Sequence, residues 1–171
     1  MDNTLKDIST QKIWSILEQV NDPEVPVLSI IDLGIVRDVK LNGDEVEVLI
    51  TPTYSGCPAM LSIEWDIKAC LIVIGGYPQE KVKVTMVLSP AWTTDWMSEA
   101  GKEKLKAYGI APPLPTASVC DIGLFAKEEA VPCPRCNSYH TTLVSRFAST
   151  ACKAHYRCED CKEPFDYFKC H

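Results

Sequence analysis

Four cysteines near the carboxyl end of the chain have the spacing of ligands to a single metal ion. They form two Cys-x2-Cys pairs, Cys133 with Cys136 and Cys158 with Cys161, separated by 21 residues. Two such pairs are typical of a zinc ribbon, because each tight turn lets its two sulfurs converge on one ion. The alternatives are two disulfides, or an iron-sulfur cluster held by the same thiolates. A closed four-thiolate site usually stabilises a fold, so we expect structural Zn2+ here.

Cys57 is the cysteine outside those pairs whose setting favours a reactive or metal-binding sulfur. It lies between Gly56 and Pro58, directly before a predicted helix. Unpaired backbone N–H groups and the helix dipole favour a thiolate at such a position, and proline is well tolerated in a first helical turn. A buried, unreactive cysteine packed under a loop explains the position equally well.

Two carboxylates, Asp22 and Glu24, flank Pro23 in the loop after the first predicted helix. Aspartate at such a place commonly accepts hydrogen bonds from the backbone of a turn. A functional interpretation makes both side chains part of a site near Cys57, but nothing in the sequence alone brings them together.

The sequence leaves the roles of the other cysteines open. Cys70 falls within a largely apolar helical pattern, which favours the core, and Cys120 has no partner at metal-ligand spacing. Cys152, Cys170 and His171 could each replace a ligand of the four-cysteine site or form a second site. The paired cysteines remain the better ligand set, because both pairs have the spacing of zinc-ribbon turns.

Conventional catalytic motifs are missing from the first 130 residues. The histidines are His140, His155 and His171, so the body of the chain has no imidazole to activate a serine or cysteine nucleophile. The chain also contains neither a phosphate-binding loop nor a dinucleotide fingerprint. We therefore expect a protein that is not an enzyme.

Composition and charge narrow the class of protein. The chain has 171 residues, 46% of them hydrophobic, which is enough for one domain with a core and a small satellite. Nine cysteines without a secretory signal predict a cytoplasmic location, and no apolar run is long enough to cross a membrane. Residues 1–130 carry eleven lysines and arginines against nineteen aspartates and glutamates, a balance that argues against nucleic acid as a partner.

Hydrophobic periodicity predicts an α+β domain over residues 1–115, a connector over 116–131 and a zinc ribbon of β structure over 132–171. The first domain has the order α-β-β-α-β-α, with a mixed three-stranded sheet. Its elements are a helix from Ser9 or Thr10 to before Asn21, strands at 35–41 and 45–51 around an Asn42-Gly43 turn, a helix at 59–74, a strand at 81–88 and a helix at 94–107. The ribbon strands are expected at 141–147, 154–157 and 165–168.

Several long motifs resemble those of known families. Three motifs resemble those of the metal-sulfur cluster biosynthetic family, which includes iron-sulfur assembly factors such as SufT. They are Asp22-Pro23-Glu24-Val25-Pro26, Ile31-Asp32-Leu33-Gly34-Ile35-Val36 and Thr51-Pro52-Thr53-Tyr54-Ser55-Gly56-Cys57-Pro58. Further motifs narrow the resemblance to the PaaD (also called PaaJ) family of accessory proteins of bacterial phenylacetyl-CoA epoxidase. These motifs are residues 88–97, 108–113 and 149–153.

The resemblance implies a role in aerobic phenylacetate catabolism. In that pathway a multicomponent oxygenase epoxidises the ring of phenylacetyl-CoA, using a di-iron component and a reductase that carries flavin and a [2Fe–2S] cluster. The chain contains no Glu-x-x-His pair of the kind that di-iron centres use, so oxygen chemistry belongs to partner subunits. The resemblance thus implies an accessory protein that assists insertion of iron or an iron-sulfur cluster into an epoxidase component, with the reductase as the expected client.

Within the family motif, Cys57 corresponds to the motif cysteine, and it is the expected transient ligand of iron or of an iron-sulfur cluster. Asp22, Glu24 and Thr51 are the candidate supporting residues. One cysteine is too few for a stable cluster, so we expect a homodimer or ligands from a partner to complete the site. Two alternatives stay open, namely a structural subunit of the oxygenase complex that handles no metal, and a zinc-ribbon nucleic-acid binder.

Overall fold

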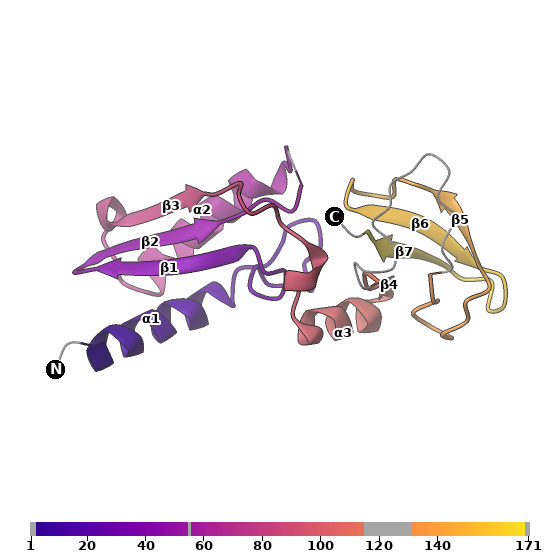
Figure 1. Ribbon diagram of the computed structural model, residues 1–171, viewed down its shortest axis with the longest axis horizontal. Coiled ribbons are helices and arrows are strands. Elements are labelled where there is room, and N and C mark those ends of the chain that lie inside the picture. The colour runs from indigo at the N-terminus through magenta and orange to yellow at the C-terminus, as the bar shows by residue number, and fades with distance from the viewer. Residues whose placement is uncertain (1–2, 55, 115–130, 170–171) are drawn as a thin grey trace. The chain divides into compact units, whose positions relative to one another are not determined.

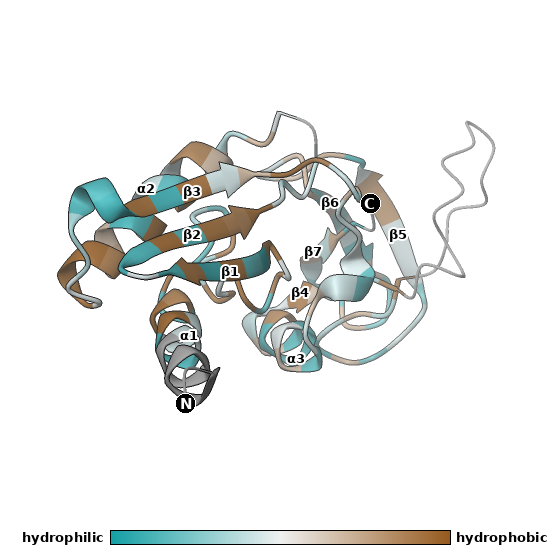
Figure 2. Ribbon diagram, turned by 60° about the vertical axis from the view of Figure 1, so that its left-hand side comes forward, coloured by the Kyte–Doolittle hydropathy of each residue, from teal (hydrophilic) through white to brown (hydrophobic). Residues whose placement is uncertain are grey.

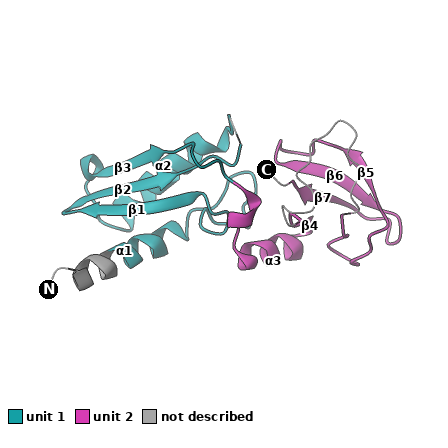
Figure 3. Ribbon diagram, in the orientation of Figure 1, with its two compact units in different colours: residues 1–92 teal, residues 93–171 magenta. Residues whose placement is uncertain are grey.

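The structure is a computed structural model that describes residues 3–54, 56–114 and 131–169, with the side chains described from Thr10 onward. It consists of two compact units, residues 1–92 and residues 93–171, which Figure 3 shows in separate colours. Cys120, Cys170 and His171 lie outside the described residues. In the described parts, no helix combines the length and the apolar character needed to cross a membrane.

The first unit is a mixed three-stranded sheet with two helices (Figure 1). The strands are β1 (Val36–Asn42), β2 (Glu45–Ile50) and β3 (Val82–Met86), in the order β1-β2-β3. β1 and β2 form an antiparallel hairpin. β3 is parallel to β2, because the helix α2 (Ala59–Val73) forms the crossover that a parallel pair requires. The α+β class and the mixed three-stranded sheet predicted from the sequence are confirmed.

The core of this unit forms where the apolar faces of its strands and helices meet. Alternate residues of β2 are buried, and the buried residues of α2 recur at helical spacing. Hydrophobic residues, brown in Figure 2, occur along both elements. Both α2 and α1 (Asn3–Leu17) contact the sheet and each other. The fully buried side chains include Ile13, Leu17, Val48, Ile63, Ile67 and Leu71.

Two boundaries in this unit differ slightly from the prediction. α1 begins at Asn3 rather than at Ser9 or Thr10, since the preceding residues include no proline or glycine that would stop a helix. In the hairpin, Asn42 pairs with Glu45, so the loop residues are Gly43 and Asp44. Gly43 has a φ of 66°, a left-handed conformation that glycine adopts without strain.

The second unit contains a short helical segment and a four-stranded sheet. Its elements are the 3-10 helix η2 (Thr94–Trp96), the helix α3 (Glu99–Tyr108) and the strands β4 (Ile110–Ala111), β5 (Thr141–Ser145), β6 (Lys153–Cys158) and β7 (Pro164–Phe168). The strand order is β4-β7-β6-β5, with β5, β6 and β7 antiparallel and β4 parallel to β7. The core is small and aromatic, and includes Tyr156, which stacks on Phe165 and meets Tyr167 edge-on.

The helix expected over residues 94–107 is two helices in the structure. Thr93 accepts a hydrogen bond from the Asp95 N–H and caps only the short η2. Ser98 then accepts a hydrogen bond of 2.9 Å from the Gly101 N–H and caps α3. Serine is a strongly preferred N-cap residue, and Ser98 rather than Thr93 or Thr94 caps the longer helix.

The break between the two compact units also differs from the domain boundary expected near residue 115. The units divide after Trp92, because the segment that follows belongs with the ribbon sheet. Ile110 and Ala111 pair with β7, and the Leu114 N–H donates to the Tyr167 hydroxyl at 3.4 Å. A two-residue strand has no periodicity to detect, so its pairing with a strand more than fifty residues later escapes sequence analysis.

Candidate metal centre and a separate thiol

The sulfurs of Cys133, Cys136, Cys158 and Cys161 converge in the second unit. All four Sγ atoms lie within 4.8 Å of one another. The Cys133–Cys161 and Cys136–Cys158 sulfur distances are 3.7 and 3.5 Å. A tetrahedral zinc ion with Zn–S bonds of about 2.3 Å requires sulfurs about 3.8 Å apart. The donor set and its spacing therefore fit one tetrahedral metal ion.

The two cysteine turns have the same backbone construction. The N–H of the first cysteine in each pair donates to the carbonyl five residues later, Cys133 to Ser138 at 2.9 Å and Cys158 to Glu163 at 3.0 Å. The residue after the second cysteine has a positive φ in both turns, 59° at Asn137 and 64° at Lys162. Asparagine tolerates this conformation, whereas at lysine it is strained. The repeated geometry indicates that both turns are shaped to aim their sulfurs inward.

Backbone N–H groups also change the pKa values of the cysteine thiols. Hydrogen bonding from the Cys161 N–H, opposed by burial and helped by the Asp160 N–H, lowers the pKa of Cys158 to about 7. The Glu163 N–H favours the thiolate of Cys161, but burial and the neighbouring sulfurs outweigh it and raise its pKa to about 12. Four thiolates this close repel one another, so they need a cation to ionise together, and the pattern suits metal binding.

A polar bridge links the two turns outside the sulfur cluster. Ser138 donates to the Asp160 carboxylate, and His140 Nδ1 lies 3.2 Å from Asp160 Oδ1. The hydrogen bond from Ser138, with that from His140, lowers the pKa of Asp160. Cys152, in contrast, lies outside the cluster. Its buried sulfur is 3.0 Å from the Thr150 hydroxyl, so it does not replace a ligand.

Cys57 lies in the first unit, at the end of the loop that leads into α2. The Cys57 N–H donates to the Tyr54 carbonyl at 3.2 Å, and the side chain is half-buried. Burial raises the pKa of the Cys57 thiol, and the Glu24 carboxylate raises it further. A hydrogen bond from the Ala59 N–H, with others involving Thr53 and Tyr54, opposes this effect without overcoming it. The backbone N–H at the helix terminus favours the thiolate, as expected, but desolvation outweighs this effect, so the pKa is raised.

The structure brings one of the two predicted carboxylates to Cys57, since Glu24 acts on the thiol electrostatically. Asp22 has a different role. Its Oδ1 accepts hydrogen bonds from the Glu24 N–H at 2.7 Å and the Val25 N–H at 2.8 Å, so it holds the loop that carries Glu24. Thr51 is buried, and among the described residues its hydroxyl has no hydrogen-bond partner.

Sequence analysis did not single out Thr53 and Tyr54, although both belong to the motif that contains Cys57. Their positions immediately before the cysteine were the available signal. Trp92 is 4% exposed, and its indole N–H donates to the Leu33 carbonyl at 2.9 Å. Cys70 is partly exposed on α2, so the expectation of a core position is only half met.

Comparison with known proteins gives two family matches and a relative over nearly the full length. Residues 118–169 match the family described as PaaD zinc beta ribbon domain, and residues 10–92 match the family described as iron-sulfur cluster assembly protein. The chain is 48% identical to a protein of Escherichia coli K12 that is named as a subunit of a putative 1,2-phenylacetyl-CoA epoxidase, over 98% of this chain and 96% of that protein. The chain belongs to the PaaD family. The resemblance found in its motifs is confirmed, and the four-cysteine cluster lies in the zinc ribbon that gives the PaaD match its description.

Other similarities cover only part of this PaaD-family chain. It is 34% identical to an Fe-S protein maturation auxiliary factor of Porphyromonas gingivalis W83, over 52% of this chain and 83% of that protein. The crystal structure of a domain of unknown function, DUF59, from Bacillus anthracis superposes with a TM-score of 0.57 and 28% identity, covering 61% of this chain and 97% of that one. Residues 93–117 fall between the two family matches.

Proposed function

We propose that this chain is a non-catalytic accessory factor of a phenylacetyl-CoA epoxidase system, and that it assists iron or iron-sulfur cluster insertion into a component of that system. The expected client is the reductase that carries flavin and a [2Fe–2S] cluster. The observation that carries this proposal is the half-buried thiol of Cys57, whose pKa burial and the Glu24 carboxylate raise, in a domain that matches iron-sulfur assembly proteins. The full-length similarity to the Escherichia coli epoxidase protein supports the assignment to this system.

In this proposal the ribbon holds a permanent Zn2+ through Cys133, Cys136, Cys158 and Cys161. The ion would stabilise a unit whose core is too small to be stable alone. A complete set of four ligands leaves no open position for a substrate, so zinc has a structural role here.

Cys57 would act differently, as a ligand that binds metal transiently. Its raised pKa means that the thiol is protonated at neutral pH, so iron must displace a proton in order to bind. The reverse step, protonation of the sulfur, favours release. One sulfur beside one carboxylate is an incomplete site, and ligands from the client or from a second copy of the chain would complete it.

The surroundings of Cys57 fit a protein client. Leu61 and Trp65, in the first two turns of α2 after Cys57, are 68% and 74% exposed. Exposed apolar and aromatic side chains of this kind are characteristic of protein contact surfaces. A client that covers them would bring its own ligands to the thiol.

The deciding experiment replaces Cys57 with serine and co-expresses the variant with the epoxidase components. The chain should fold and retain its zinc, while the purified reductase should contain flavin with a reduced amount of [2Fe–2S] cluster, measured by iron analysis and electron paramagnetic resonance. Cys70→Ser is the matched control, because Cys70 is a partly exposed thiol on α2 and should leave cluster content normal. Normal cluster content with Cys57→Ser would refute the proposal.

The second candidate is a structural subunit of the oxygenase complex that handles no metal, and the name of the Escherichia coli relative as an epoxidase subunit favours it. This candidate requires co-purification with the oxygenase at fixed stoichiometry. It also requires that Cys57→Ser leaves both the assembly and its cluster content unchanged.

A further inference from the structure

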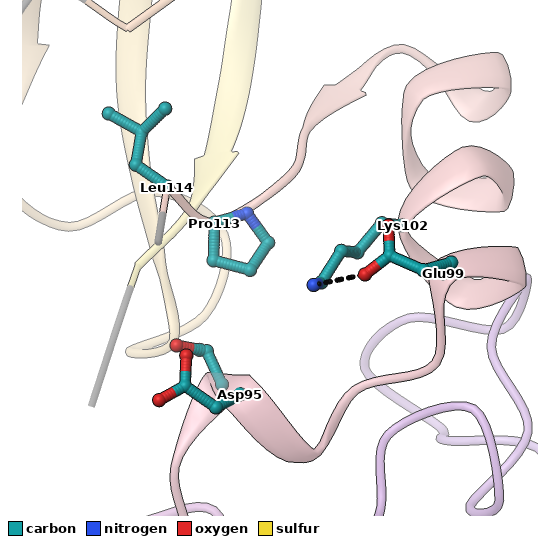
Figure 4. Close-up of a pocket in the computed structure, with 6 residues that line it drawn as sticks. Asp95, Glu99, Lys102, Pro113 and Leu114 are labelled. Atoms are coloured by element: carbon teal, nitrogen blue, oxygen red, sulfur yellow. Dashed lines mark hydrogen bonds and ion pairs between the residues drawn. The ribbon is translucent and has the colours of Figure 1, made fainter. Parts of the chain in front are cut away.

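A pocket of about 280 Å3 lies in the segment that neither family match covers. It is lined by Thr94, Asp95, Glu99, Lys102, Pro113 and Leu114, all from the second unit (Figure 4). These residues come from η2, from the first turn of α3 and from the chain after β4. The same stretches contain the motifs, residues 88–97 and 108–113, that narrow the resemblance to the PaaD family.

Thr94 is the most unusual residue of this pocket. It is 2% exposed, and its hydroxyl has no hydrogen-bond partner within the part of the chain that the structure describes. A buried hydroxyl that stays without a partner costs folding free energy, because it has lost its hydrogen bonds to water. A ligand that entered the pocket and hydrogen-bonded to Thr94 would remove that cost.

The charge of the lining indicates the sign of the ligand. Two carboxylates, Asp95 and Glu99, face one ammonium group, Lys102, so the lining carries one net negative charge. Lys102 Nζ lies 2.7 Å from Glu99 Oε1, and Figure 4 shows this ion pair on the α3 side of the pocket with Asp95 on the η2 side. A cationic group is therefore favoured over an anionic one.

An apolar wall completes the pocket. Pro113 and Leu114 contribute the apolar part of the lining, and the hydrogen bond from the Leu114 N–H to the Tyr167 hydroxyl ties this segment to β7. A ligand that fits such a lining has an aliphatic stem and a cationic head with several N–H donors. Arginine and lysine side chains have this chemistry.

We propose that this pocket binds an arginine or lysine side chain of a partner protein. The aliphatic stem packs on Pro113 and Leu114, and the cationic head lies at Asp95 and donates to the Thr94 hydroxyl. The site is separate from Cys57 in sequence and chemistry, so it does not depend on iron handling. It assigns a recognition role to a segment that lies outside both family matches.

Titration of the zinc-loaded full chain with N-acetyl-arginine methylamide, followed by amide chemical shifts, tests the proposal. Shifts should be concentrated at residues 94, 95, 99, 102 and 114. The neutral isostere N-acetyl-citrulline methylamide should bind about two- to fivefold more weakly, as loss of one solvent-accessible ion pair predicts. Agmatine, a free alkylguanidine, distinguishes a site for small amines from one for side chains, because only the former binds agmatine better than the blocked amino acid.

Variants give the second arm of the test. Asp95→Asn should weaken binding of the arginine probe about two- to fivefold, whereas Glu103→Gln, at an exposed glutamate of α3 that does not line the pocket, should have a smaller effect. Thr94→Val should weaken binding while leaving the melting temperature unchanged or raised, since it removes an unpaired hydroxyl. Equal binding of the arginine and citrulline probes, or preferential binding of N-acetyl-aspartate, would overturn the proposal.

Discussion

The two sulfur sites of this chain contrast in how complete they are. In the ribbon, four sulfurs lie within 4.8 Å of one another, and repeated turns with N–H donors hold them there. At Cys57, one half-buried sulfur has a carboxylate nearby and a raised pKa. The first site supplies every ligand that a tetrahedral ion needs, and the second supplies one sulfur.

Under the proposed function, this difference separates a site for a resident ion from one for an ion that binds transiently. A complete set of thiolates binds zinc so strongly that folding and binding become one event. An incomplete site holds metal only while another molecule contributes ligands, so its occupancy depends on that encounter. The proposed function requires both kinds of site, one that stabilises the fold and one that exchanges metal. Each site can be tested separately.

The largest expected effect follows from breaking the complete site. Cys158→Ser should abolish zinc binding and unfold the ribbon strands β5–β7, because structural zinc in small domains contributes about 10–16 kcal/mol of folding free energy. Zinc analysis and amide spectra measure both effects, and the signals of the first unit should persist. Cys152→Ala is the control, since that buried cysteine lies outside the cluster and should retain one zinc per chain. A ribbon that stays folded without zinc would contradict the structural role of the metal.

The first unit should depend on its apolar core instead. Ile63 is 0% exposed beneath α2, so Ile63→Ala should lower the free energy of unfolding by about 2–5 kcal/mol without changing zinc content. Urea titration followed by amide signals of the first unit measures the loss. Leu61→Ala, on the exposed side of the same helix, should cost less than about 0.5 kcal/mol. Equal losses for both variants would show that the burial pattern of α2 is incorrect.

The two sites also differ in how far the sequence predicted them. Spacing alone identified the four ribbon sulfurs, because a Cys-x2-Cys turn is a local structure whose geometry follows from a few residues. The alternation in β2 and the helical spacing in α2 likewise predicted the mixed sheet, since each period reports which face is buried.

The failures concern quantities that only the folded chain determines. The sign of the Cys57 pKa shift depends on how deeply the folded chain buries the thiol and on Glu24, 33 positions earlier. Pairing of β4 with β7 depends on a long-range contact of two residues, which moved the break between units to Trp92. The pocket at Thr94 had no sequence signal, because its walls come from three separate segments.

A smaller effect on stability tests whether Asp22 holds the loop that carries Glu24. Asp22→Ala should destabilise the first unit by about 1–3 kcal/mol, because the Glu24 and Val25 N–H groups lose their acceptor in a buried setting. Asp22→Asn retains an acceptor oxygen and should recover most of that stability. Urea titration of both variants measures the difference. If Asp22→Ala leaves stability unchanged, the aspartate does not hold the loop and must be assigned another role.

The smallest expected effect concerns the electrostatic coupling between Glu24 and Cys57. Burial raises the pKa of the Cys57 thiol most, and the Glu24 carboxylate raises it further. Glu24→Gln should therefore lower that pKa and increase the fraction of thiolate at any pH below the pKa. Iodoacetamide should then alkylate Cys57 about two- to threefold faster at pH 8. The rates of variant and parent should converge at high pH, where both thiols are ionised.

Peptide mass spectrometry resolves Cys57 from the other cysteines in this experiment, and a pH series gives the pKa of each variant. Glu18→Gln, at an exposed glutamate near the end of α1, removes the same charge farther along the chain and should leave the profile of Cys57 unchanged. Identical profiles for Glu24→Gln and the parent would mean that Glu24 does not act on the thiol. A slower reaction in Glu24→Gln would also contradict the coupling, because removal of a nearby negative charge should favour the thiolate.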